Sequence, residues 1–249
     1  MATGPDGYPP AVTELTEQPL LRVDRRDDGV LLATLDRPKV NALDTALLHE
    51  IEAMARGCSE DPPGAVVITG AGRMFAAGAE LAGFADPELR GAQADAFRSA
   101  FAALERIPCP TIAAVNGLAL GGGAELAWCC DLRILGERSV FGQPEVLLGI
   151  IPGGGATQRL TRLVGRSTAK RLIWGGAQVD ASEALRLGLA DEVVPDDELL
   201  DRALALAAGY AAGPWSPSPL RPVAETPRPW RACSPANACW TWAPAAASI

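Results

Sequence analysis

Two glutamates and a run of three glycines are the residues of this chain whose types and spacing could do chemistry. Glu125 closely follows Gly121–Gly123, and Glu145 follows Pro144 in glycine- and aliphatic-rich surroundings that disfavour a carboxylate. The glycines lead from a predicted strand into a predicted helix, so free amides at the helix start would face a negatively charged ligand. Taken alone, such glycines also suit a tight turn. Together with two carboxylates, they predict an amide cradle beside a pair of acid/base groups.

We expect the two carboxyl groups to differ in pKa. Glu125 lies in the first turn of the predicted helix, where the helix dipole favours negative charge, so it should stay ionised and serve as a general base. Glu145 precedes the apolar run Val146-Leu-Leu-Gly-Ile-Ile151. An apolar pocket would raise the pKa of Glu145, which suits a proton donor. A purely structural role for both glutamates is the alternative.

Strands that alternate with helices must position these residues. The continuous apolar run at 64–69 predicts a strand buried on both faces, and shorter runs predict strands at 20–24, 30–35, 111–115 and 132–135. Residues 70–79 are interpreted as a glycine-punctuated loop. Helical patterns occur at 44–56, 87–107, 121–129, 156–163, 167–174, 181–187 and 196–212. This alternation predicts an α/β fold.

Charge and composition exclude several classes of function. The net charge of −8 argues against nucleic-acid binding, which needs clustered Lys and Arg. The six cysteines lack CxxC spacing, and the single histidine, His49, lies on a predicted amphipathic helix as a surface residue, so we expect no metal site. The N-terminus lacks a signal-peptide pattern, and no charge-free apolar run reaches the ~18 residues of a membrane span. We therefore expect a cytoplasmic protein with reduced thiols and no membrane partner.

Several longer motifs resemble those of the crotonase (enoyl-CoA hydratase/isomerase) family, and most closely those of enoyl-CoA hydratase. The resemblance extends from about Val23 to Gly213. The motifs are Leu35–Leu43 (LDRPKVNAL), Phe75–Leu81 (FAAGAEL), Ile112–Ala127 (IAAVNGLALGGGAELA), Phe141–Glu145 (FGQPE) and Gly149–Leu160 (GIIPGGGATQRL). The resemblance implies a crotonase-like α/β spiral of ββα repeats. It also implies hydration of a 2-trans-enoyl-CoA to a 3-hydroxyacyl-CoA, with coenzyme A as part of the substrate and no metal or redox cofactor.

The same resemblance assigns roles to four positions. The backbone N–H groups of Ala79 and Gly122 would form an oxyanion hole that stabilises the thioester enolate. Glu125 and Glu145 match the two hydratase carboxylates, so water would add at the β-carbon and a proton at the α-carbon. Members that use a His/Asp pair are a poor match, because His49, the single histidine, lies outside every motif on a predicted amphipathic helix.

A coenzyme A site is implied along the second glycine loop. Glu80 stands where the family commonly has Asp, and Ala82-Gly-Phe84 stands where Lys is frequent, so the phosphate contact expected there lacks its lysine. Arg37 or Lys39 would then supply the cation for the diphosphate. The full set of expected coenzyme A or substrate contacts is Arg37, Lys39, Ala77, Glu80, Leu81 and Gly121.

The two ends of the chain differ from the predicted catalytic domain at 20–213. Residues 1–19 lack periodicity and are expected to form a disordered leader. Residues 214–249 are rich in Pro and Trp and show neither helical nor strand periodicity, where the resemblance implies helices that cover the acyl-CoA site and build a trimer or hexamer. A disordered tail is one interpretation, although such tails are normally poor in Trp and Cys. We favour a frameshift in a GC-rich gene, which would give an aberrant, non-helical tail.

Three other functions fit parts of the pattern. A Δ3,Δ2-enoyl-CoA isomerase would rely mainly on the second carboxylate. A catalytically impaired homologue, disabled by its tail, would bind acyl-CoA without turnover. RNA binding, which one family member owes to a lysine-rich helix, is disfavoured because residues 43–61 carry four acidic residues after Asp44 and one arginine.

Overall fold

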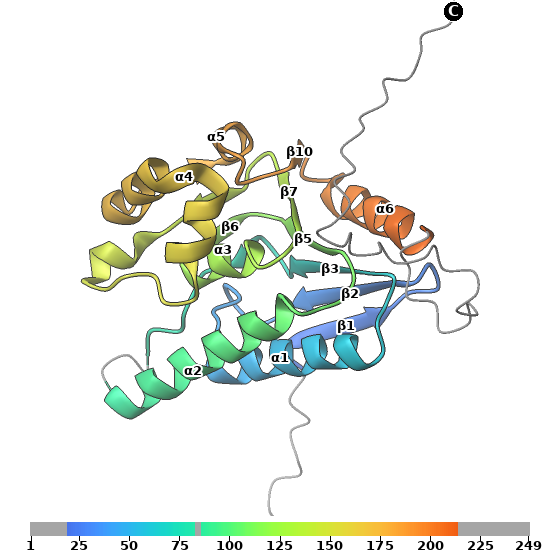
Figure 1. Cartoon of the computed structure of the whole chain (residues 1–249), viewed down its shortest axis with the longest axis horizontal. Coiled ribbons are helices and arrows are strands. Elements are labelled where there is room, and N and C mark those ends of the chain that lie inside the picture. Colours follow the sequence, from blue (N-terminus) through green and yellow to red (C-terminus); the bar gives the residue numbers. More distant parts are fainter. Residues whose placement is uncertain (1–18, 83–85, 214–249) are drawn as a thin grey trace, which may run out of the picture. The chain divides into compact units, whose positions relative to one another are not determined.

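The computed structural model describes residues 19–82 and 86–213, all of them in one structural unit. The interpretations of residues 1–18 as a disordered leader and of 214–249 as a frameshifted tail lie outside the described residues. Two sheets and the helices packed on them make up this part of the chain, and both sheets are parallel over most of their strand pairs (Figure 1).

The larger sheet has the strand order β1-β2-β3-β5-β7-β10. Only β1 and β2 pair antiparallel, as a hairpin, and the other neighbours are parallel. Every residue of β3 and β5 is buried, which confirms that their continuous apolar runs are covered on both faces. The strands are β1 (Leu21–Arg25), β2 (Val30–Leu35), β3 (Ala65–Gly70), β5 (Thr111–Val115), β7 (Leu132–Gly136) and β10 (Glu192–Val194).

Helices cover the two faces of this sheet. Because successive side chains of a strand point to opposite faces, Val66 and Ile68 of β3 join the main core, and Ala65 and Val67 join a second core. The second core is closed by α6 (Leu199–Ala211), drawn in orange in Figure 1. The main core is closed by α1 (Thr45–Glu60) and α2 (Pro87–Leu104), which lie side by side in Figure 1.

The smaller sheet has the order β4-β6-β8-β9 and was not predicted. Its strands are β4 (Met74–Ala76), β6 (Leu118–Leu120), β8 (Val140–Gly142) and β9 (Gln178–Asp180). The interpretation of residues 70–79 as a loop is therefore wrong at β4. Each of these strands has only three residues, which is too short for alternation to show in the sequence.

A ββα repeat links the two sheets. β3 continues into β4 and then α2, and β5 continues into β6 and then α3 (Gly122–Ala127). β7 continues into β8, a short 3-10 helix η1 (Pro144–Leu148) and then α4 (Ala156–Gly175). This order confirms the predicted α/β spiral. The two predicted helices at 156–163 and 167–174 are the halves of α4, which is interrupted at Gly165, where φ is +75°. The last helix before β10 is α5 (Ala181–Leu187).

The single histidine is a surface residue, as predicted, and the cysteines among the described residues are buried. His49 is exposed on α1, and Cys58, Cys109, Cys129 and Cys130 are buried and free. Cys233 and Cys239 belong to the tail outside the described residues. In residues 19–82 and 86–213, no group of three or more His, Cys, Asp or Glu side chains is arranged to hold a metal ion. No helix in that part of the chain is both long and apolar enough to cross a membrane.

Asn41 fastens the loop before α1 to the segment that leads into β4. Its side chain is buried, and its amide nitrogen donates to the carbonyl oxygens of Ala71, Met74 and Phe75 at 2.9–3.2 Å. Its side-chain oxygen accepts from the N–H of Arg37 at 3.0 Å, and its own φ is +51°. Two segments that are far apart in sequence are thereby held together directly upstream of residue 79.

We predict that Asn41→Ala lowers the free energy of unfolding by about 2–3 kcal/mol, because buried polar groups lose their partner. Asn41→Gly is the matched control, since it loses the same hydrogen bonds but tolerates a positive φ. It should be less destabilising than Asn41→Ala by about 1 kcal/mol. Urea unfolding measures both values, and an Asn41→Ala variant as stable as the wild type would contradict the assignment.

Candidate functional site

The three consecutive glycines at the start of α3 are required by close contacts. Gly121 has φ +52°, and a β-carbon there would lie 3.1 Å from a carboxylate oxygen of Glu145. A β-carbon on Gly122 would lie 2.7 Å from the Phe97 ring, and one on Gly123 would lie 2.2 Å from the carbonyl oxygen of Ala76. The glycines therefore let the start of α3 approach β4, α2 and Glu145 at once, and they do more than make a turn.

Ala79 lies beside this helix start. Ala79 forms an isolated parallel β-bridge with Leu43, and its two sequence neighbours make the hydrogen bonds. The Leu43 N–H donates to the carbonyl oxygen of Gly78 at 2.7 Å, and the Glu80 N–H donates to the carbonyl oxygen of Leu43 at 3.1 Å. In this pairing the N–H of Ala79 itself points away from Leu43. A β-carbon on Gly78 would lie 3.4 Å from the backbone nitrogen of Gly122, so the two loops are adjacent.

One cavity of about 220 Å³ contains all four of the groups that the sequence put forward for chemistry. Ala79 and Gly122 line it together with Glu125 and Glu145. The remaining wall comes from α2 and from the segment after η1. Its residues are Arg90, Gln93, Ala94, Phe97, Arg98, Ile150, Ile151, Gly153 and Gly154. The cavity thus brings the two glycine-loop residues and the two glutamates together inside a largely apolar wall.

The carboxylate of Glu125 is buried and held by backbone amides. Its side chain is 2% exposed; Oε1 accepts from the N–H of Ala156 at 2.7 Å, and Oε2 accepts from the N–H of Gly154 at 3.1 Å. Ala156 is the first residue of α4 and Gly154 lies in the loop just before it, so the carboxylate is held where α4 begins. Burial nevertheless raises the pKa of Glu125, and the amides only offset this effect. Our expectation that the position at a helix start sets the pKa of Glu125 is therefore wrong in direction, because the loss of water on burial is the largest influence on this carboxyl group.

Glu145 lies in η1, with its carboxylate close to Gly121 before the start of α3. Its pKa is raised to about 7, mainly by burial and to a smaller extent by the nearby charge of Glu125. Its Oε2 is buried and has no hydrogen-bond partner among the described residues. The sequence-based expectation of a raised pKa is confirmed in direction, and its cause is burial, as expected. A carboxyl group in this state can hold a proton near neutral pH and donate it into the cavity.

Gln143 is a site residue that the sequence analysis did not single out. Its side chain is 1% exposed, and Nε2 donates to the carbonyl oxygen of Gly121 at 3.0 Å. The Glu125 N–H donates to the same oxygen at 3.0 Å. Because the carbonyl of Gly121 and the N–H of Gly122 share one peptide plane, these bonds fix the direction of the Gly122 amide. A glutamine two residues before a glutamate in an apolar run was the available signal. Arg90 and Arg98 also line the cavity, and the sequence carried no signal that would have singled them out.

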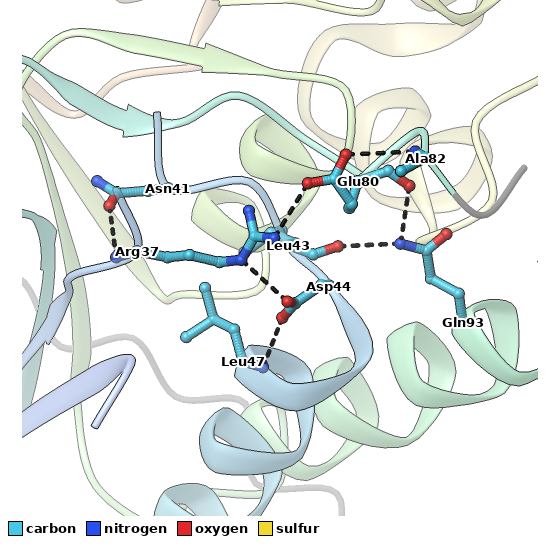
Figure 2. Close-up of polar contacts among 8 residues, drawn as sticks. All are labelled: Arg37, Asn41, Leu43, Asp44, Leu47, Glu80, Ala82 and Gln93. Carbon is cyan, nitrogen blue, oxygen red and sulfur yellow. Dashed lines mark hydrogen bonds and ion pairs between the residues drawn. The ribbon is translucent and has the colours of Figure 1, made fainter. Parts of the chain in front are cut away.

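The expected coenzyme A contacts lie outside the lining of the cavity. Figure 2 shows Arg37 between two carboxylates: Nε is 2.9 Å from Asp44, and Nη2 is 3.0 Å from Glu80. This double pairing reduces the charge that Arg37 can offer a diphosphate. Gln93 Nε2 ties the backbone of this region to α2, donating to the carbonyl oxygens of Leu43 and Glu80 at 3.2 Å.

The other residues that were expected to contact coenzyme A are spread along the same loops. Lys39 and Leu81 are exposed, and the N–H of Ala77 donates to the carbonyl oxygen of Val40 at 3.0 Å. Gly121 contacts Glu145, as described above. Contacts between coenzyme A and these residues, and with Arg37 and Glu80, stay predictions.

Comparison with known proteins gives one consistent result. Residues 25–217 match the family model described as enoyl-CoA hydratase/isomerase. A probable enoyl-CoA hydratase, echA8, of Mycobacterium tuberculosis is 45% identical over 184 residues, which cover 73% of this chain and 72% of the relative. The 2,3-dehydroadipyl-CoA hydratase of Escherichia coli is 45% identical over 191 residues, covering 75% and 74%. The crystal structure of enoyl-CoA hydratase from Bacillus anthracis superposes with a TM-score of 0.74 at 40% identity, covering 78% of this chain and 77% of that chain.

The raised pKa of Glu145 predicts a pH-dependent stability. Between its ordinary value of 4.5 and about 7, the folded protein binds more protons at this group than the unfolded chain, so stability falls as pH rises through that window. The free energy of unfolding of Glu145→Gln should therefore exceed that of the wild type by about 1–2 kcal/mol at pH 8 and by little at pH 4. The figure at pH 8 is reduced because the side chain is partly exposed to solvent. Urea unfolding at both pH values measures this. Exposed Glu60→Gln controls for lost charge, and an equal difference at both pH values would contradict the prediction.

Proposed function

We propose, because the chain belongs to the enoyl-CoA hydratase/isomerase family, that it catalyses the reversible hydration of a 2-trans-enoyl-CoA to a 3-hydroxyacyl-CoA. The observation that carries this proposal is the single cavity lined by Ala79, Gly122, Glu125 and Glu145. Coenzyme A is part of the substrate, and the residues of the cavity can supply the acid/base chemistry themselves.

The thioester oxygen would bind between the N–H groups of Ala79 and Gly122. When water adds to the β-carbon, negative charge moves onto this oxygen as the enolate forms. Two amides fixed in the backbone stabilise that charge without reorganising, and each such donor typically lowers the barrier by ~3 kcal/mol. The contacts of Gln143 and Glu125 with the Gly121 carbonyl support this role, because they hold the Gly122 amide in place before substrate arrives.

The two carboxyl groups would divide the proton transfers. Ionised Glu125 takes a proton from the attacking water, whose oxygen bonds to the β-carbon. Protonated Glu145 gives its proton to the α-carbon, which converts the enolate to the saturated thioester. Exchange of protons with solvent then resets both groups. The pKa of about 7 for Glu145 supports the donor role, since the group is substantially protonated near neutral pH.

The presence of both carboxyl groups in one cavity favours hydration over a shift of the double bond. An isomerase needs one group that moves a proton between two carbons, whereas addition of water needs a second group to activate the water. Glu125, with two backbone amides on its carboxylate and a place in the cavity wall, supplies that second group.

A trimeric or hexameric assembly and a cytoplasmic location belong to the same proposal. Large apolar side chains stand exposed beside the cavity among the described residues, with Leu147 and Ile151 both 74% exposed, which suits burial against another copy. The buried free thiols of Cys58, Cys109, Cys129 and Cys130 suit a reducing compartment.

We predict that Glu125→Gln and Glu145→Gln each lower the rate of hydration by ~10² or more, because the isosteric amide cannot transfer the proton. Binding of the CoA ester should change little, since the shape of the cavity is kept. Loss of the enoyl absorbance on adding enzyme to crotonyl-CoA measures the rate, and titration with a 3-hydroxyacyl-CoA measures binding. Either variant acting at near the wild-type rate would overturn its role, and binding without turnover by the wild type would indicate an impaired homologue.

Replacing Gly122 separates its amide from its lack of a side chain. Gly122→Pro removes the N–H, and Gly122→Ala keeps it, while both add a β-carbon that meets the Phe97 ring. Gly122→Pro should therefore turn over crotonyl-CoA ~10²-fold more slowly than Gly122→Ala, the loss typical of one oxyanion-hole donor. Equal rates for the two variants would count against the oxyanion assignment.

A further inference from the structure

Arg159, near the start of α4, joins α2 to the loop that precedes α4. Its side chain is mostly buried, and its Nε donates to Oε1 of Glu105 at 2.7 Å. Its Nη1 donates to the carbonyl oxygen of Gly154 at 2.6 Å, and the guanidinium lies over the ring of Phe101, 6.0 Å from the centroid. The sequence analysis gave this residue no role.

The residue that Arg159 holds is also a donor to the carboxylate of Glu125. Gly154 accepts from Arg159 through its carbonyl oxygen and donates its own N–H to Oε2 of Glu125. Two residues further on, the N–H of Ala156 donates to Oε1. A β-carbon on Gly155, where φ is +117°, would clash with Nη1 of Arg159. The glycines at 154 and 155 therefore allow the guanidinium and the carboxylate to approach the same turn from opposite sides.

We propose that Arg159 is a positioning residue for the hydration reaction: through Gly154 it holds the amide donors on Glu125, and Glu105 holds Arg159 in that place. The inference rests on the proposed function, in which Glu125 is the general base. Arg159 does not line the cavity, so its effect on the reaction passes through Glu125.

The charge of Arg159 acts on Glu125 as well. Burial raises the pKa of Glu125, whereas the amides of Ala156 and Gly154 and the positive charge of Arg159 lower it. Burial lowers the pKa of Arg159, but the hydrogen bond to Glu105 and the surrounding negative charges, that of Glu125 among them, raise it above its ordinary value, so the guanidinium stays cationic. Arg159 thus favours the ionised form of Glu125 that the general base requires.

The other titratable groups near Glu125 come from three elements. Glu145 of η1 faces it across the cavity, and Arg90 and Arg98 of α2 line the same cavity. Cys129 lies in the turn that follows α3, where its Sγ donates to the carbonyl oxygen of Glu125 at 3.2 Å. Burial raises the pKa of the Cys129 thiol well above its ordinary value, so it is neutral at the pH of the experiment below.

Three variants test the proposal. Arg159→Met removes both the charge and the hydrogen bonds, Arg159→Lys keeps the charge, and Glu105→Gln keeps the charge of Arg159 and its bond to Gly154. Two readouts apply to each variant. One is the acidic limb of kcat/KM against pH for crotonyl-CoA, and the other is the titration of the Glu125 carboxyl carbon by 13C NMR in the ligand-free protein, assigned with Glu125→Gln.

We expect Arg159→Met to move both the acidic limb and the NMR titration of Glu125 to higher pH, because a positive charge that favours the carboxylate is lost. At neutral pH its kcat/KM should fall ~10-fold or more. Arg159→Lys should restore the position of the acidic limb while recovering only part of the rate. Glu105→Gln should leave the limb at or below its wild-type pH and reduce the rate by only a few-fold.

A lower rate for Arg159→Met at every pH, with neither the acidic limb nor the NMR titration displaced, would overturn the proposal and leave a purely structural role. If Arg159→Met does not fold, the contrast between Arg159→Lys and Glu105→Gln decides, since displacement of the limb by Glu105→Gln alone would contradict it. If the wild type does not hydrate crotonyl-CoA, the proposed function fails, whereas the NMR titration still tests the action of Arg159 on Glu125.

Discussion

A carboxylate that leaves water needs hydrogen-bond donors in place of its hydration shell, and much of this site is arranged around that need. Glu125 is 2% exposed, and its donors are the backbone amides of Gly154 and Ala156 rather than side chains. Backbone amides can reach a buried carboxylate only where a helix begins or a turn leaves N–H groups free. The end of the β8–α4 connection therefore has to lie against α3, and this requirement ties the third repeat of the spiral to the second.

The ββα repeat explains why loops from three parts of the chain meet at one cavity. Each of β3, β5 and β7 runs through the larger sheet and continues into a short strand of the smaller sheet. Since β4, β6 and β8 are parallel neighbours, the segments that follow them leave the smaller sheet at the same edge. Those segments supply Ala79, the start of α3, and η1 with Glu145. The apolar strands thus provide a rigid frame, and the chemistry lies in the connections.

The sequence was most informative where a long pattern or a rare residue type was involved. The buried strands β3 and β5 were predicted from continuous apolar runs, and Glu125 and Glu145 stood out as carboxylates in apolar surroundings. The three-residue strands of the smaller sheet could not be predicted, because their pairing partners are distant in sequence and no period is visible in so short a run.

The pKa of Glu125 was misjudged for a related reason: the degree of burial depends on the whole fold, whereas the position in a helix can be read locally. Gln143 and Arg159 act through the carbonyl oxygens of Gly121 and Gly154, and contacts of a side chain with the main chain leave little trace in composition.

Gly165, within α4, shows how stereochemistry alone can divide a helix. Its φ of +75° is one that L-residues rarely adopt, yet no atom beyond the adjoining backbone of the helix lies within 4 Å of the place where a β-carbon would stand. L-residues are disfavoured here by the handedness of the α-carbon, since φ +75° with ψ 162° is a conformation that essentially only glycine adopts, at a cost of about 1–3 kcal/mol to other residues, and not by lack of room. The half of α4 that carries Ala156 and Arg159 is therefore separated by a break from the half that ends at Gly175. The second half can diverge in sequence, or acquire a new surface, without disturbing the register of the first.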